Sequence, residues 1–466
     1  MYKKSEFNKN RHLMWGICFS AIVSCSLMAC HDEAKVQEKP VYDPATPITL
    51  TSFFPDSGRI RDNVILEGKN FGADPSKIRV YFNKTKAPVI GASGRRVFVT
   101  VPRMPGDICT VSIVAGDGKT PGFDSVVYDH TFRYRTTISV STVCGDGTYT
   151  NRPGSLDQAL ISPFQLDVDG NGNIFVGTEH GFQGGNTTDV GFVRINEAEQ
   201  TMEMIQNMGT ISGDSYGPRF EGINADKFTG MLYTTIRQQV MSYVTIDPAE
   251  NWVPRPKMFR WVSNPAHPEY DNDHPTTTGN YMGYNQFDGY MYTRFSNGHI
   301  VRIDPNTGEG MVVFKTPQTG TSIGIDFDPK HPNMMYIAGY NPAGVGHRIW
   351  RLDLLTEEWI QLNQSPTAGH RDGHISQAMF NAPYGLRFDM DGIAYISDLQ
   401  NNCIRRYDPE TGMVSTVLGI PGTAGFQNGG QEDALFDQPS AVGIDMDGNV
   451  YVADRSNRRV RKLAIE

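Results

Sequence analysis

The stretch that decides the fold is FDMDGIAYISD, residues 388–398, because the chain repeats it almost unchanged as IDMDGNVYVAD at residues 444–454. Each copy is an apolar segment, an Asp-Gly turn and a second apolar segment, which is the pattern of a β-hairpin. The two copies lie 56 residues apart, as counted between Asp391 and Asp447. A hairpin that recurs at this spacing predicts the repeated sheets of a β-propeller.

The same pattern divides the C-terminal part of the chain into six units, which begin near residues 163, 218, 280, 321, 383 and 439. Each hairpin is followed by a third apolar segment, a turn and a fourth segment, and four strands make one propeller blade. We therefore predict a six-bladed propeller over residues 138–466. Residues 138–143 form a spare strand before the first unit, and the last unit stops after its third strand at 463–465. Pairing these two strands would close the ring and leave no open edge.

The motif resembles NHL repeats in the last two units. The matching segments are 381–386 with 402–405, and 437–442 with 457–460. The second, third and fourth units depart from the family pattern, so the resemblance supports the fold and implies no family-level activity.

Residues 47–135 alternate short apolar segments with turns, which predicts a β-sandwich. The segments 54–58, 66–72, 80–83 and 101–102 resemble the IPT/TIG immunoglobulin-like domains. That resemblance implies an immunoglobulin-like fold and, as in most secreted bacterial proteins with such domains, the role of a spacer.

The N-terminus has the features of a targeting segment. A basic stretch precedes an apolar run from Leu13 to Ala29, which predicts a signal peptide over residues 1–29. A membrane-spanning helix is the alternative, but the run ends in Leu27-Met28-Ala29-Cys30, which resembles a bacterial lipobox. The resemblance implies that Cys30 is lipidated and anchors the protein at the outer membrane, exposed on the surface. The polar segment 30–46 is predicted to be a flexible tether.

Composition limits the partners. The net charge is −9, and four basic residues and one acidic residue precede Cys30, so the chain from Cys30 onward carries about −12. A nucleic-acid partner requires a cationic face, so this class is disfavoured. Cys109, Cys144 and Cys403 are far apart in the sequence and are expected to be buried apolar residues rather than disulfides or metal ligands.

Several motifs that suggest chemistry have simpler structural explanations. Residues 167–173 begin like a calcium loop, but Thr178 occupies the position of the bidentate glutamate, so a hairpin turn is favoured. His370 and His374 would share a metal only on a helix, and their segment is glycine-rich. Glu179 and His180 complete the weak metal candidates, and no cofactor is predicted. Asp398 and Asp454, each followed three or four residues later by asparagine, are expected to hold the blade loops.

Ligand binding is expected on the loops that enter the inner strands and on those that join second and third strands. In a propeller these loops gather on one side, which we call the long-loop face, and loops on a rigid scaffold commonly carry function. An aromatic ring there can stack on a sugar, and arginine or histidine can bond its hydroxyls or carboxylates. The predicted ligand-binding residues are Tyr149, Arg152, Phe182, Arg219, Arg237, Tyr270, Tyr281, Arg294, Tyr340, His347 and His374. The same loops also contain Tyr216, His274, Phe295, Arg371 and Phe426.

The combination of lipid anchor, IPT/TIG domain and NHL-like propeller resembles surface lipoproteins of gut anaerobes. Such proteins often accompany polysaccharide-utilisation systems built around SusC/SusD-like transporters. The resemblance implies a non-catalytic protein that captures a glycan, a polysaccharide or oligosaccharide. One alternative is a propeller hydrolase or lyase with a metal in the central channel, and another is a protein–protein scaffold at an outer-membrane transporter.

Overall fold

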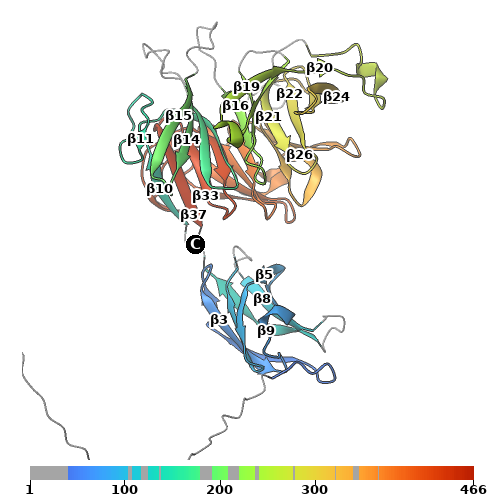
Figure 1. Ribbon diagram of the computed structural model, residues 1–466, viewed down its shortest axis with the longest axis vertical. Helices are drawn as coiled ribbons and strands as arrows, with labels where there is room; N and C mark the ends of the chain where they lie inside the picture. The colour runs from blue at the N-terminus through green and yellow to red at the C-terminus, as the bar shows by residue number, and fades with distance from the viewer. Residues whose placement is uncertain are drawn as a thin grey trace, which may run out of the picture.

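The computed structural model describes residues 40–102, 108–116, 124–135, 138–178, 191–207, 220–236, 241–275, 279–320, 322–339, 346–365 and 367–465. These residues form a β-sandwich of strands β1 to β9, followed by a propeller of strands β10 to β37 (Figure 1). No helix in these ranges has the length and hydropathy needed to cross a bilayer. The all-β prediction is confirmed.

The N-terminal sandwich consists of two sheets in the orders β1-β3-β7-β6 and β2-β9-β8-β4-β5. Its strands alternate buried and outward-facing residues, as in β4 and β8, so one face of each sheet lines a shared core. The bounds are β1 (Thr49–Phe54), β2 (Ser57–Gly58), β3 (Asn63–Lys69), β4 (Ile78–Phe82), β5 (Thr85–Ala87), β6 (Val89–Ala92), β7 (Arg96–Thr100), β8 (Ile108–Ala115) and β9 (Ser125–Tyr134).

The described end of the predicted tether, residues 40–46, packs against this sandwich. Asn70 accepts a hydrogen bond from the Asp43 N–H at 2.9 Å, and its amide donates to the carbonyls of Asp43 and Thr46 at 2.8 and 2.5 Å. The Tyr42 ring packs against the core. The structure thus differs from the predicted flexible tether at residues 40–46, because one half-buried ring and one amide hold them against the sandwich.

Six sheets make up the propeller. The first strands are β12 (Pro163–Val168), β16 (Phe220–Ala225), β21 (Gly279–Asn285), β25 (Ser322–Asp328), β30 (Pro383–Phe388) and β35 (Pro439–Ile444). The second strands are β13 (Asn173–Thr178), β17 (Leu232–Ile236), β22 (Tyr290–Phe295), β26 (His331–Gly339), β31 (Ala394–Asp398) and β36 (Val450–Asp454). The third strands are β14 (Gly191–Asn196), β18 (Ser242–Ile246), β23 (His299–Ile303), β27 (Arg348–Asp353), β32 (Cys403–Asp408) and β37 (Arg459–Ile465).

The fourth strands complete the blades. They are β15 (Thr201–Asn207), β19 (Pro254–Met258), β24 (Glu309–Lys315), β28 (Trp359–Gln361), β33 (Met413–Leu418) and, in the last blade, β10 (Ile138–Cys144). Short outer strands are β11 (Gly154–Ser155), β20 (Arg260–Trp261), β29 (Gly373–His374) and β34 (Gly429–Gly430). The 3-10 helices are η1 (Pro75–Lys77), η4 (Pro248–Glu250), η5 (Pro268–Tyr270), η6 (Ile375–Gln377) and η7 (Leu399–Asn401).

The ring closes where the sequence predicts. β10 pairs antiparallel with β37 from Ile138↔Ile465 to Cys144↔Val460, so the first strand after the sandwich becomes the fourth strand of the last blade. Closure of this kind removes the two unpaired edges that an open array would expose. The six-bladed prediction is confirmed.

The first strands line the centre of the ring and approach each other closely. A Cβ on Gly324 would lie 2.7 Å from the Tyr384 carbonyl oxygen, and a Cβ on Gly222, which has a φ of +68°, would lie 2.6 Å from the Met282 nitrogen. Only glycine fits at such contacts. The middle of the channel is consequently almost filled by backbone, with a cavity of about 10 Å³.

The repeated aspartates hold the blade loops, as predicted. In blade 5, Asp398 accepts hydrogen bonds from Asn381 N–H at 2.7 Å, Asn401 Nδ2 at 2.8 Å and Arg405 at 2.9 Å. Asp454 and Arg461 repeat the arrangement in blade 6 at 2.7 Å.

The hairpin and cysteine predictions also hold. Asp169 accepts the backbone N–H groups of Asn171 and Asn173, each at 2.9 Å, so residues 167–173 form the predicted hairpin turn. The thiols of Cys109, Cys144 and Cys403 are all buried and unbonded to one another.

Candidate functional site

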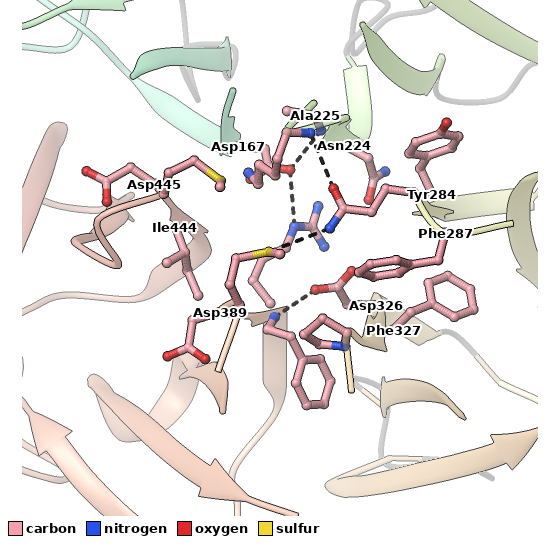
Figure 2. A pocket seen from close by; sticks show the side chains of 17 residues that line it. Asp167, Asn224, Ala225, Tyr284, Phe287, Asp326, Phe327, Asp389, Ile444 and Asp445 are labelled. Atoms are coloured by element: carbon pink, nitrogen blue, oxygen red, sulfur yellow. Dashed lines mark hydrogen bonds and ion pairs between the residues drawn. The ribbon is translucent and has the colours of Figure 1, made fainter. Parts of the chain in front are cut away.

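One end of the central channel, where the first and second strands turn, is lined by six charged side chains, Asp389 and Asp445 among them (Figure 2). We call the other four the channel cluster: Asp167, Lys227, Asp326 and Arg387. Asp167 accepts hydrogen bonds from the Ala225 N–H at 2.8 Å and from Lys227 Nζ at 3.0 Å, and it lies 3.5 Å from Arg387 Nε. These groups come from different blades, so the cluster ties the ring together at its centre.

Arg387 is the centre of that cluster. Its guanidinium donates to the carbonyl oxygens of Ile325 at 3.2 Å and Ile223 at 2.5 Å, which belong to β25 and β16. Asp326 accepts the Phe388 N–H at 2.7 Å, and burial raises the pKa of its carboxyl to about 6 although Arg387 opposes the shift. Asp389 and Asp445 line the same cavity, so acidic side chains outnumber the two basic ones there.

The cavity beside the channel cluster is too small for a sugar. Its volume is about 40 Å³, enough for roughly two or three water molecules. Exposed apolar side chains surround the mouth, among them Phe287, Met390 and Met446. Because a cavity of this size can neither hold nor orient a saccharide, we assign the channel cluster to the framework.

The opposite end of the channel is filled by apolar side chains. Phe164, Tyr281, Ile323, Tyr384 and Leu399 form one buried cluster there. The Tyr281 and Tyr384 hydroxyl groups are 2.9 Å apart. Tyr281, a predicted ligand-binding residue, is therefore part of this plug and is only 4% exposed.

Arg294, another predicted ligand-binding residue, is also buried. Its guanidinium donates to the Gly320 carbonyl at 2.8 Å and to Thr316 Oγ1 at 2.9 and 3.2 Å, and burial lowers its pKa to about 10. The guanidinium is therefore buried beneath the loop, where its N–H groups bond the loop's oxygen atoms, and it is not on the surface that a ligand would contact.

The histidines at residues 347, 370 and 374 do not converge. His347 Nδ1 accepts the Ala382 N–H at 3.0 Å, and burial lowers its pKa. His370 Nε2 lies 2.7 Å from Thr416 Oγ1, whereas His374 Nδ1 lies 2.9 Å from Ser376 Oγ. Within the described ranges, no three His, Cys, Asp or Glu side chains are grouped so that they could hold a metal.

Tyr270 is the last residue of η5 and packs against the histidine that precedes this helix. Its ring stacks on His267 with the centroids 4.9 Å apart, and His267 bridges Glu269 at 2.8 Å and Glu357 at 2.6 Å. The hydrogen bond to Glu357, followed by that to Glu269, raises the pKa of His267. Arg152 is exposed and donates to the Gln158 carbonyl at 3.0 Å.

Some predicted residues cannot be placed. The following lie outside the described residues: Cys30, Glu179, His180, Phe182, Tyr216, Arg219, Arg237 and Tyr340.

The described part of the long-loop face contains a cluster at the junction of blades 6 and 1, which we call the arginine corner: Tyr149, Phe426, Arg458 and Arg459. The Arg458 guanidinium lies 4.0 Å from the centroid of the Tyr149 ring, and that of Arg459 lies 3.7 Å from the Phe426 ring. Phe426 remains 43% exposed. Cations at such distances attract the ring faces, so the pairs hold both aromatic rings in place.

Sequence reasoning missed Arg458 and Arg459 as site residues. The signal was present in the repeat: blade 5 has DLQNNC at residues 398–403, whereas blade 6 has DRSNRR at residues 454–459. Three positions change to arginine while the framework residues stay the same.

The comparisons with known proteins agree with this architecture. Residues 48–134 match the family model of the IPT/TIG domain. The chain is 46% identical over 55 residues to NHL repeat-containing protein 2 of Bos taurus, and 33% identical over 95 residues to the protein SUPPRESSOR OF QUENCHING 1, chloroplastic, of Arabidopsis thaliana. The matches cover 12% and 20% of this chain and only 7% and 9% of those proteins, respectively. The propeller is of the NHL type.

Three solved structures share the fold over 91% of the chain. A Bacteroides thetaiotaomicron protein of unknown function is 22% identical with a TM-score of 0.73 and is covered over 100% of its length. Auxiliary nutrient binding proteins of Bacteroides thetaiotaomicron and Bacteroides ovatus are 21% and 20% identical, with TM-scores of 0.55, and are covered over 99% and 100% of their lengths. At these identities the likeness establishes the fold.

Proposed function

We propose that this protein is a surface lipoprotein that captures a glycan on the long-loop face of its propeller. The observation that carries the proposal is the arginine corner, where Phe426 is 43% exposed and Tyr149 is held by a stacked guanidinium. Exposed aromatic rings on a rigid scaffold suit the apolar face of a sugar, and nearby polar groups supply specificity.

Two further features support a binding protein rather than an enzyme. The channel is filled by the channel cluster at one end and by the Tyr281–Tyr384 plug at the other, which leaves little room for a reacting substrate. The fold is shared with two auxiliary nutrient binding proteins of Bacteroides. Under this proposal Cys30 carries the lipid, the IPT/TIG domain is the spacer, and SusC/SusD-like outer-membrane proteins receive the captured glycan.

The binding proposal is tested by isothermal titration of the full chain, prepared without its lipid, against a panel of neutral and acidic polysaccharides. We expect binding to at least one polymer, with loss of affinity in Phe426→Ala. Phe228→Ala is the matched control, because Phe228 is also exposed but follows β16 at the other end of the channel. Absence of binding to every polymer, or equal loss in both variants, would refute the proposal.

The anchor proposal has its own test. Cys30→Ala should move the protein from the membrane fraction to the soluble fraction, and protease treatment of intact cells should degrade the wild type if it is displayed outward. Retention of the variant in the membrane would contradict lipidation.

A scaffold role is a second candidate, favoured by the exposed apolar residues at the turn end of the channel. Phe228 and Phe287 are 62% and 42% exposed, and their rings are 6.5 Å apart. Exposed apolar patches commonly mark protein interfaces. Cross-linking in cells should then capture a SusC/SusD-like transporter with the wild type and not with the Phe228→Ala/Phe287→Ala variant, and an unchanged pattern would count against this role.

A further inference from the structure

Blades 5 and 6 provide an internal comparison that separates framework from function. In both turns an asparagine three residues after the framework aspartate donates to it: Asn401 to Asp398 at 2.8 Å, and Asn457 to Asp454 at 2.9 Å. The ion pairs to Arg405 and Arg461 are equivalent as well, at 2.9 and 2.7 Å. The fold of the turn is therefore complete without the arginines that only blade 6 carries at residues 455, 458 and 459.

Arg458 is also an unfavourable residue for its backbone. Its φ is +54°, and the equivalent Asn402 in blade 5 has a φ of +55°. Asparagine tolerates this left-handed conformation better than arginine does, because its short side chain can bond locally. In blade 5 the Asn402 side chain instead reaches the next blade, where it accepts the Gln438 N–H at 2.9 Å, 36 positions further along the chain. Positive φ values recur at other non-glycine residues of the chain, and at this position an arginine stands where blade 5 has an asparagine.

The guanidinium groups keep their charge available. Arg458 donates to the Ser456 carbonyl, and Arg459 donates to the carbonyls of Asn457, at 2.7 Å, and Asp146. Among the described residues neither arginine has an ion-pair partner. Hydrogen bonds to Thr148, whose N–H lies 2.7 Å from the carboxylate, lower the pKa of Asp146, and the nearby Arg459 adds to that shift. The two guanidinium groups, bonded to neutral oxygens and stacked on rings, place two positive charges beside the single carboxylate of Asp146 in a chain of net charge −9.

We propose that the arginine corner binds an anionic group of the glycan, a uronate carboxylate or a sulfate ester, while Phe426 contacts the sugar ring. The inference rests on the proposed function and specifies its ligand as an acidic polysaccharide. The planar fork of a guanidinium matches the two oxygens of a carboxylate or sulfate, and a stacked arginine loses little conformational freedom on binding. The corner is partly exposed at all four residues, so a polymer can reach it.

The test uses two matched pairs of polymers with the full chain: polygalacturonic acid against its methyl ester, and dextran sulfate against dextran. We expect binding to at least one acidic member, weaker binding at higher salt, and no comparable binding to its neutral partner. Stronger binding to polygalacturonic acid than to its methyl ester identifies a carboxylate ligand, and stronger binding to dextran sulfate than to dextran identifies a sulfate ligand. The double variant Arg458→Asn/Arg459→Gln should bind at least about tenfold more weakly, which corresponds to about 1.4 kcal/mol.

Arg302→Gln is the matched control, because Arg302 also stacks on a tyrosine, at 4.5 Å from the Tyr290 ring, but lies on β23 of blade 3. The Arg302→Gln variant should bind the acidic polymer as tightly as the wild type does. Arg458→Asn alone should fold at least as stably as the wild type, because blade 5 has an asparagine at the equivalent position. Equal binding of neutral and acidic polymers with unchanged affinity in the double variant would overturn this inference and leave glycan capture standing. A loss of affinity in Arg302→Gln equal to that in the double variant would also overturn it, because the effect would then come from overall charge and not from the arginine corner. Binding to no glycan would remove the proposed function itself.

Discussion

The buried pair of Asp454 and Arg461 gives the most direct test of the blade framework. Both side chains are 0% exposed and lie 2.7 Å apart. Asp454 also accepts the Asp437 N–H and the Asn457 amide, each at 2.9 Å. Arg461 donates onward to the Gln427 carbonyl at 2.7 Å and to Asn428 Oδ1 at 2.8 Å. Replacing Asp454 with alanine therefore removes the centre of a network that holds the loop before β35.

The expected loss is large because the arginine stays behind. Asp454→Ala leaves a buried guanidinium without its counter-charge, and breaking a buried pair from one side costs about 3–5 kcal/mol. A domain has about 5–15 kcal/mol of stability in total, so we expect the free energy of unfolding to fall by about a fifth or more. The matched variant Asp398→Ala in blade 5 should lose a similar amount, since Arg405 is equally buried.

The measurement is denaturant unfolding at pH 7.5, followed by tryptophan fluorescence, because Trp252, Trp261, Trp350 and Trp359 all lie in the propeller. The double variant Asp454→Ala/Arg461→Met should be destabilised by less than the sum of the two single changes, since it removes the unpaired charge. A loss below about 1 kcal/mol in Asp454→Ala, or strict additivity in the double variant, would refute the account.

Three other predictions follow from buried groups. Burial raises the pKa of Asp398 and Asp454 to about 6, so the folded state binds extra protons between about pH 4 and 6. The stability that this proton uptake contributes is full below about pH 4 and is lost as the pH rises through 6. In an Asp398→Asn/Asp454→Asn variant the thermal unfolding temperature should therefore fall less between pH 4 and 6 than in the wild type. The same pH dependence in both proteins would contradict the prediction. Burial also raises the pKa of the Cys144 thiol to about 12, so a thiol reagent at pH 8 should modify none of the three buried cysteines until denaturant is added, and rapid labelling of the native protein would count against this burial. Arg387→Met should lower the free energy of unfolding by about 3–5 kcal/mol, because the carboxylate of Asp167 and its neighbours lose the counter-charge of the guanidinium. An unchanged denaturation midpoint would show that the channel cluster does not stabilise the ring.

Local patterns in the sequence were sufficient for the architecture. The Asp-Gly hairpin, its recurrence after 56 residues and the spare strand at 138–143 predicted six blades and their closure, because strand period and turn chemistry are properties of neighbouring residues. The same local logic explains why Asp398 and Asp454 were correctly assigned to the framework: an aspartate followed by an asparagine bonds within its own turn.

The candidate site could be predicted only in part. The loops that contain Tyr149 and Phe426 were found as ligand-binding candidates, since loop positions and aromatic content can be read from a repeat. The burial of Tyr281 and Arg294 could not, because a long side chain at the end of a strand turns inward or outward according to the oxygens and rings that other blades supply.

The sequence alone thus determined the repeat, the order of strands, the IPT/TIG domain and the loops in which binding residues should be sought. Only the tertiary structure decided which of these residues meet. Arg387 closes the channel because inner strands from several blades bring their carbonyls and Asp167 within its reach. Arg458 meets Tyr149 because ring closure brings together residues more than 300 positions apart, at the two ends of the propeller, whereas Arg459 and Phe426 are 33 positions apart. Contacts of this kind depend on the path of the whole chain, whereas the hairpin depends on eleven residues.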